Sequence, residues 1–260
     1  MHEDLLLTER RSLIQDRLAA AGRVIAADLA KEMNLSEDTI RRDLRDLAAQ
    51  GLCVKVYGGA LKVSPASGSL AERVAAVPDR KAALAQAAAG LVSDGSTIFI
   101  DAGSTNQLIS RYLPKDMDLR VVTNAPLIAM ELGGRSNTDI ILLGGRFDPH
   151  TGSCLGSKPM QDLALLRPDL TFLGACGLDV VEGVTAFSFD EADFKRSLCQ
   201  VSRAVVVAAT SDKLGTAAPF VVAPASSLGT LIVESSMTDD GVAPYAALGI
   251  RIVRAIGDRQ

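Results

Sequence analysis

The chain has 260 residues, of which 48% are hydrophobic and 22% charged, with a net charge of −4 and a sequence pI of about 5.3. This length supports one large core, or a small domain beside a medium one, and the acidic balance argues against nucleic-acid binding by the protein taken as a whole. No uninterrupted apolar run reaches the roughly 18 residues that span a bilayer, so we expect a cytoplasmic protein with no membrane partner.

The residues that usually carry catalysis or metal binding are sparse. The four cysteines form no CxxC pair, and the only histidines are His2 and His150. Since neither metal-ligand spacing nor a GxSxG nucleophile motif occurs, we expect reduced thiols, no metal, no cofactor and no catalytic residue.

The first sixty residues predict three short helices followed by a hairpin. The helices are expected over 8–21, 26–33 and 37–50, and Ser36 is a suitable N-cap for the third. Two short alternating runs then flank Gly58-Gly59, a pattern typical of a β-hairpin.

The third predicted helix separates an apolar face from a basic one. Ile40, Leu44 and Leu47 share one face, whereas Arg42 falls nearly opposite. The stretch 39–62 holds five Lys or Arg and two Asp, a net charge of +3. A solvated helix with internal Arg–Asp pairs would have the same charges, but the order helix, helix, turn, capped basic helix and hairpin favours a helix that reads DNA.

From about residue 77 onward, short β-branched runs alternate with helical stretches. The predicted strands cover 97–101, 120–124, 139–145, 169–175, 204–209, 230–234 and 250–255. This alternation predicts a mostly parallel sheet with helices on both faces. We therefore predict a DNA-binding domain over 1–62, a linker over 63–77 and a larger α/β domain over 78–260.

The stretch DAGSTN, Asp101 to Asn106, follows the first of these strands and leads into a helix. Gly103 permits a tight turn, and Ser104 and Thr105 offer hydroxyl and N–H groups at a helix N-terminus, which suits a phosphate. Ligands of open α/β sheets bind at the carboxyl ends of strands, where several other runs also end in small polar residues. The sequence predicts an anion pocket there, with Lys213 in reach, but it lacks the GxGxxG fingerprint of dinucleotide sites.

The segment RRSLIQDRLAAAGRVIAADLAKEMNLSEDTIRRDLRDLAAQGLCVKVYGGAL resembles the winged helix-turn-helix of the DeoR family of bacterial transcription regulators. The pattern S-x-x-TIRRDL-x-x-L followed by a GGA wing carries the resemblance, although many members have histidine where Tyr57 stands. The DNA-contacting residues that the resemblance and the predicted wing imply are Ser36, Thr39, Arg41, Arg42, Arg45, Lys55 and Tyr57.

The second half resembles the same family over nearly its whole length, in AAGLVSDGSTIFIDAGSTN, VVTNAPLIA, DEADFKRSL and SDKLG among other stretches. In that family this domain is similar to ribose-5-phosphate isomerase and senses a phosphorylated metabolite without converting it. The effector residues that the resemblance implies are Asp101, Gly103, Ser104, Thr105, Thr123, Asn124, Gly145, Gly174, Gly177, Glu191 and Lys213. Lys195 is a further candidate, although its spacing from Glu191 is also typical of a surface ion pair. Cys176 stands where a small or polar residue is more usual.

The expected protein is therefore a repressor of a sugar or polyol catabolic operon, not an enzyme. Its expected partners are operator DNA, a phosphorylated sugar or polyol, and at least one further copy of itself. The alternative is a sugar-phosphate isomerase with an appended DNA-binding head, with Asp179 or Glu191 as its base. A protein-interaction module that does not bind DNA is a third interpretation.

Overall fold

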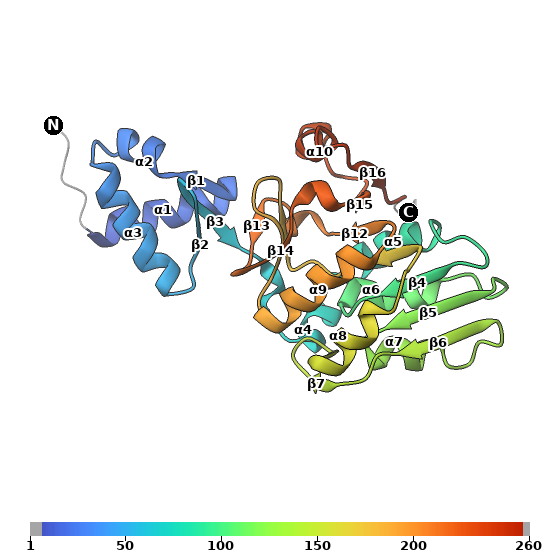
Figure 1. The fold of residues 1–260 in the computed structure, drawn as a ribbon. Coiled ribbons are helices and arrows are strands. Elements are labelled where there is room, and N and C mark those ends of the chain that lie inside the picture. Colours follow the sequence, from blue (N-terminus) through green and yellow to red (C-terminus); the bar gives the residue numbers. More distant parts are fainter. Residues whose placement is uncertain (1–6, 257–260) are drawn as a thin grey trace.

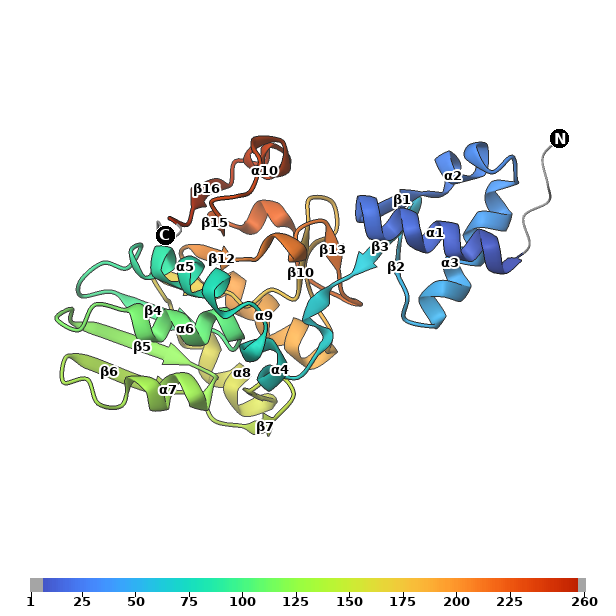
Figure 2. The same ribbon diagram turned by 180° about the vertical axis from the view of Figure 1, so that it is seen from behind.

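A computed structural model describes residues 7–256, so His2 lies outside the described residues. Figures 1 and 2 show a small N-terminal unit set apart from a larger body, with strand β3 (Gly59–Val63) running from the first toward the second. Within the described residues, no helix is both long enough and apolar enough to cross a membrane.

The N-terminal unit contains the three predicted helices, α1 (Leu7–Ala21), α2 (Ala26–Glu32) and α3 (Glu37–Ala49). They surround a core that includes Ile14, Leu18, Ile40, Leu44 and Leu47, so the predicted apolar face of the third helix is confirmed. Helix α1 begins at Leu7, one residue before the predicted start.

The predicted hairpin is also present, but its turn lies one residue earlier than expected. Strand β2 (Val54–Val56) pairs antiparallel with β3, and Val56 lies opposite Gly59, which leaves Tyr57 and Gly58 as the turn. An unpredicted strand, β1 (Arg23–Ile25), pairs with the other edge of β3. A Cβ atom at Gly59 would lie 1.9 Å from the Val24 carbonyl oxygen, so this close approach requires glycine.

The body is built on a seven-stranded sheet in which all pairings are parallel, and its order is β16-β15-β12-β9-β4-β5-β6. The strands are β4 (Thr97–Ile100), β5 (Leu119–Thr123), β6 (Thr138–Leu142), β9 (Leu170–Phe172), β12 (Val205–Ala208), β15 (Thr230–Val233) and β16 (Arg251–Arg254). Each overlaps a predicted strand, so the expected α/β architecture is confirmed. The chain builds outward from β4 through β5 to β6, and then returns to build the other half from β9. The order therefore reverses between β4 and β9.

Helices cover both faces of this sheet, as predicted. On one face lie α5 (Pro78–Ala89), α6 (Ser104–Tyr112) and α7 (Pro126–Leu132). On the other lie α8 (Ser157–Ala164), α9 (Phe189–Val201) and α10 (Asp239–Ala246). Strand β12 shows the reason, because Val205 and Val207 pack into one core and Val206 and Ala208 into the other.

Several short elements surround the main sheet. The strands are β7 (Arg146–Asp148), β8 (Ser153–Leu155), β10 (Gly177–Asp179), β11 (Gly183–Ala186), β13 (Thr216–Ala217) and β14 (Phe220–Ala223). The short helices are η1 (Pro65–Ser67), α4 (Leu70–Ala75), η2 (Ser211–Lys213) and η3 (Ala225–Ser227). Strands β10, β11 and β14 form an antiparallel sheet, and β7 pairs with β8.

The segment 63–77, predicted as a linker, folds against the body. It contains η1 and α4, and Ser69 and Glu72 form a capping box at the start of α4. The backbone N–H of Leu70 donates to the His150 carbonyl at 2.8 Å. A capping box satisfies the free N–H groups of a first helical turn, which explains why this small-residue stretch is helical.

Strand β3 also joins the two parts of the chain. Its last residues, Lys62 and Val63, pair in parallel with Thr216 and Ala217 of β13. The backbone N–H of Ser64 continues the ladder by donating to the Ala217 carbonyl at 3.1 Å. The central strand of the wing is thus hydrogen-bonded directly to the α/β body.

Candidate functional site

Helix α3 presents a basic surface on the side away from its core. Ser36 caps the helix by accepting a hydrogen bond from the Thr39 N–H at 3.2 Å, as predicted. Arg42 and Arg45 are exposed, and neither forms an ion pair or a hydrogen bond with any described residue. Arg41 differs, because it pairs with Glu37 at 2.7 Å one helical turn away. Two guanidinium groups therefore remain without a partner in the part of the chain that the structure describes.

The two aspartates next to Arg42 and Arg45 hold α3 against α1 instead of neutralising Arg42. Asp43 is 1% exposed, and its carboxylate pairs with Arg10 and Arg11 of α1. Asp46 also pairs with Arg11. The alternative of internal Arg–Asp pairs is thus wrong for Arg42, since both aspartates are engaged by α1.

The wing extends this surface. Tyr57 at the turn is fully exposed, and Lys55 on β2 is exposed as well. Helix α3 and the wing together offer the cationic and polar groups that recognise a phosphate backbone and base edges.

The predicted anion cradle lies where the strand order reverses. Asp101 follows β4 and Gly174 follows β9, and the Gly174 N–H donates to Asp101 Oδ2 at 2.9 Å. In open α/β sheets, ligands bind at this kind of reversal, outside the carboxyl ends of the strands. A cavity of about 320 Å³, open solvent at its mouth included, lies there.

The lining combines a helix N-terminus with three cations. The cavity is lined by Arg73, Ala102, Gly103, Ser104, Thr105, Asn106, Gly174, Ala175, Cys176, Lys195, Ala208 and Lys213. Ser104 and Thr105 open α6, whose free N–H groups favour an anion. Lys213 donates to the Ala175 carbonyl at 2.9 Å. Burial, with repulsion from neighbouring cations, lowers the pKa of Lys213 to about 8.

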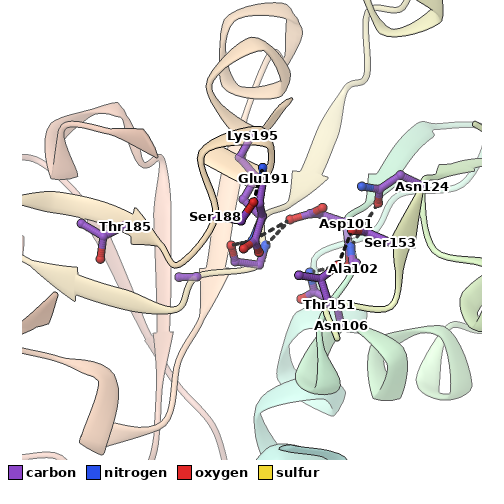
Figure 3. Close-up of polar contacts among 12 residues, drawn as sticks. Asp101, Ala102, Asn106, Asn124, Thr151, Ser153, Thr185, Ser188, Glu191 and Lys195 are labelled. Atoms are coloured by element: carbon purple, nitrogen blue, oxygen red, sulfur yellow. Dashed lines mark hydrogen bonds and ion pairs between the residues drawn. The ribbon is translucent and has the colours of Figure 1, made fainter. Parts of the chain in front are cut away.

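Beneath the cavity lies a buried ionic cluster, drawn in Figure 3. Lys195 of α9 contacts Glu191 at 2.6 Å and Asp101 at 3.5 Å, and its ammonium also donates to the Gly174 carbonyl at 2.6 Å. The Lys195 side chain is 3% exposed and that of Glu191 is 8% exposed, so this is not the surface pair that their spacing favoured. Burial opposes the charge of Lys195, but Glu191 and Asp101 together raise its pKa.

Asp101 is the least satisfied member of this cluster. Its Oδ1 atom is buried and accepts no hydrogen bond from any residue between 7 and 256. Burial raises the pKa of Asp101, and the nearby Glu191 carboxylate acts in the same direction, against the opposing effect of Lys195. An unpaired buried acceptor is costly, and such atoms occur disproportionately at functional sites.

Two further predicted residues, at the end of β5 and directly after it, support the cradle without lining the cavity. The Asn124 side-chain oxygen accepts a hydrogen bond from the Ala102 N–H at 3.2 Å, as Figure 3 shows. The Thr123 hydroxyl donates to the Ile100 carbonyl at 2.6 Å. Both residues therefore hold the end of β4 in position.

The remaining predicted glycines serve close packing at other places. A Cβ atom at Gly145 would lie 2.7 Å from the Leu155 carbonyl oxygen, so Gly145 fits the approach of β8. A Cβ atom at Gly177 would lie 2.6 Å from the carbonyl oxygen of Thr216 in β13, so Gly177 allows the close approach of β13. Neither residue lines the cavity.

Sequence reasoning did not identify Arg73. It belongs to the segment predicted as a linker, yet it lines the cavity from α4. The signal that predicts its helix is the S-x-x-E pattern from Ser69 to Glu72, which precedes it directly. Across residues 7–256, no group of three or more His, Cys, Asp or Glu side chains is arranged to hold a metal ion.

Two protein-family models match this chain. One, described as a DeoR-like helix-turn-helix domain, matches residues 10–66, and the other, described as a DeoR C-terminal sensor domain, matches residues 77–235. Together they cover the basic helix, the wing and every residue that lines the cavity except Arg73.

Curated relatives match over most of their length. An uncharacterised HTH-type transcriptional regulator of Escherichia coli K12 is 34% identical over 94% of each chain. A glycerol-3-phosphate regulon repressor of the same strain is 31% identical, and the match covers 80% of this chain and 83% of the repressor. A putative aga operon transcriptional repressor of Escherichia coli O157:H7 is 28% identical, and the match covers 95% of this chain and 93% of that repressor. Among solved structures, a ribose-5-phosphate isomerase from Methanocaldococcus jannaschii covers 53% of this chain and 54% of its own at 17% identity, with a TM-score of 0.38.

Proposed function

Since this chain belongs to the DeoR family of transcription regulators, we propose that it represses a sugar or polyol catabolic operon and responds to a phosphorylated metabolite of that pathway. It is a DNA-binding regulator and not an enzyme, as its two family domains and its named relatives indicate. One relative is named for the glycerol-3-phosphate regulon, which supports a phosphorylated polyol or sugar as the class of effector.

The observation that carries this proposal is the strand that connects the two sites. Lys213 lines the cavity, and β13 begins three residues later. Strand β13 pairs with the end of β3, whose other half forms the wing with β2. A ligand that shifts the Lys213 loop therefore acts on the strand that positions the DNA-binding surface. Such coupling requires the ligand to bind the two arrangements unequally, and about 1–3 kcal/mol is typical.

For DNA, we infer that α3 enters the major groove and that the wing contacts the backbone. The contacts we assign to α3 and its cap come from Ser36, Thr39, Arg41, Arg42 and Arg45. Those we assign to the wing come from Lys55 and Tyr57. Arg42 and Arg45 are the strongest candidates for base edges, because no described residue competes for their guanidinium groups.

The DNA half is tested by Arg42→Ala in a mobility-shift titration with an operator fragment obtained by selection on the full-length protein. We expect a loss of about 1–3 kcal/mol in operator binding, because a bidentate Arg–guanine contact has that magnitude. Arg111→Ala removes the same charge from the exposed C-terminal end of α6 and serves as the control. Wild-type affinity of Arg42→Ala across a salt titration would exclude a DNA contact.

For the effector, we assign the phosphate to the N-terminus of α6 and to Lys213. Gly103, Ser104, Thr105 and Gly174 line that position, and Asp101, Thr123, Asn124 and Glu191 support it from beneath. Ser104→Asp introduces a negative charge there and should abolish ligand-induced release from DNA while DNA binding itself is retained. Ser136→Asp, at the exposed opposite edge of the sheet, is the matched control. Unchanged release by the Ser104→Asp variant would overturn the assignment.

We further propose a cytoplasmic protein that is at least a dimer, because paired recognition helices read paired half-sites. The exposed apolar side chains Phe189 of α9 and Val221 of β14 lie on adjacent elements and offer a surface for self-association. Light scattering on the purified full chain tests this point, and a monomer at the concentration that binds DNA would contradict it. The domain boundaries, with a DNA-binding domain that ends at residue 62 and an α/β domain that begins at residue 78, also remain a proposal.

A further inference from the structure

Three of the positive charges around the cavity have no carboxylate partner among the described residues. Lys195 has two carboxylate partners, but Arg73, Lys81 and Lys213 have none within 4.0 Å among the described residues. Within residues 7–256, the Lys213 ammonium donates only to the Ala175 carbonyl, and Arg73, Lys195 and Lys81 repel its charge. Lys81 is 5% exposed and donates to the carbonyl oxygens of Arg73 and Ala76.

Three neighbouring cations held by carbonyl dipoles alone are unfavourable, because each dipole offers only partial charge against a full one. The cost is removed when an anion enters. A dianion suits the excess of positive charge better than a monoanion, which favours a phosphate monoester over a carboxylate.

Arg73 is placed to take part in such a contact. It lies on α4, and its guanidinium donates weakly to the Ser69 carbonyl at 3.4 Å, to the Thr151 carbonyl at 3.5 Å and, better, to the His150 carbonyl at 3.1 Å. Its Nη1 atom makes no hydrogen bond with any described residue. A guanidinium fork with free N–H groups matches the geometry of a phosphate.

We propose that Arg73 is a direct ligand of the effector's phosphate group, supplied from the segment between the DNA-binding domain and the α/β body. This inference rests on the proposed function, which places a phosphorylated effector in the cavity. It adds to the pocket a residue from the segment that connects the two domains, and this residue lines the same cavity as Lys213.

The position of Arg73 gives the contact a consequence for DNA binding. Ser64, at the other end of the same segment, donates its hydroxyl to the Cys176 carbonyl at 2.5 Å, and Cys176 also lines the cavity. The segment is thus attached to the pocket wall at Ser64, directly after β3, and to the loop that contains His150 through Leu70 and Arg73. A phosphate that draws Arg73 inward therefore moves α4 relative to the wing, so Arg73 is needed for the response to effector and not for DNA binding.

The test compares Arg73→Gln, Arg73→Lys and the control Arg111→Gln in the full-length protein. Glycerol 3-phosphate and inorganic phosphate are the probes, measured by calorimetry and by ligand-induced release of an operator fragment. We expect Arg73→Gln to weaken probe binding about tenfold or more, the value of one charge-assisted contact. Arg73→Lys should retain part of the affinity, and Arg111→Gln all of it. All three variants should bind operator DNA like the wild type without probe.

The outcomes separate this inference from the function on which it rests. If the wild-type protein binds neither probe nor any of a panel of sugar phosphates, the sensor proposal fails and the role of Arg73 fails with it. If the wild type binds, Ser104→Asp abolishes binding and Arg73→Gln leaves it unchanged, only the role of Arg73 is overturned. A melting temperature without probe, measured for each variant, distinguishes loss of a contact from loss of the fold.

Discussion

The titration of Lys213 makes effector binding depend on pH. Its pKa of about 8 means that the free protein holds this side chain about nine-tenths charged at pH 7 and about one-tenth charged at pH 9. A phosphate monoester stays dianionic over the same range, because its second pKa is about 6. If only the ammonium form binds the dianion, affinity falls about tenfold between pH 7 and pH 9. Binding raises the pKa of Lys213, so about half a proton is taken up at pH 8.

Calorimetry with glycerol 3-phosphate at pH 7, 8 and 9, in buffers of different ionisation enthalpy, measures both quantities. Lys213→Arg is the control, since a guanidinium remains charged throughout and should bind with nearly constant affinity. An affinity of the wild type that does not change with pH, together with no proton uptake, would refute the placement of Lys213 against the phosphate.

Two further predictions concern the scaffold on which the sites depend. Asp43→Ala leaves Arg10 and Arg11 without a buried carboxylate, so we expect the free energy of unfolding to fall by about 2 kcal/mol in urea titrations. Asp38, whose side chain is 92% exposed, provides the control, and Asp38→Ala should change the free energy of unfolding by less than about 0.5 kcal/mol. If the two variants lost the same stability, the ion pairs of Asp43 with α1 would not stabilise the domain. Gly174→Ala places a Cβ atom 2.4 Å from the Ala102 carbonyl oxygen and should lower the melting temperature and abolish probe binding. Gly134→Ala, with open space around it, is the control, and a Gly174→Ala protein that binds the probe normally would show that the cradle tolerates displacement.

Local sequence pattern was sufficient for most of the secondary structure. The alternation of β-branched runs with helical stretches predicted all seven strands of the main sheet, because such runs are buried on both sides and must be apolar throughout. The cap at Ser36 and the spacing of Ile40, Leu44 and Leu47 likewise located the third helix. These features depend on neighbours within a few residues.

Short elements with weak pattern were harder to predict. Strand β1 has three residues and pairs only because Gly59 lets its backbone approach β3. The segment 63–77 is rich in small residues, a composition shared by linkers and by tightly docked chain. Its capping box was the one local signal that distinguished the two.

The ion pairs were harder to predict than the short elements, because they depend on the tertiary structure. The sequence places Asp43 beside Arg42, and Glu191 and Lys195 one turn apart, but it does not contain the information that Arg10 and Arg11 reach Asp43 or that α9 is buried over Asp101. Such pairs join residues distant in the chain, and their energies depend on burial that arises only after the elements pack.

The amino-acid sequence by itself thus determined the family, the three N-terminal helices and the seven strands of the main sheet, since periodicity, caps and turn residues act over short distances. Only the tertiary structure decided which cations keep a carboxylate partner, that Arg73 from the connecting segment faces the same cavity as Lys213, and that β3 continues from the wing into the body. The physical reason is that charge neutralisation and strand pairing are settled by contacts between segments far apart in the chain, which no local pattern encodes.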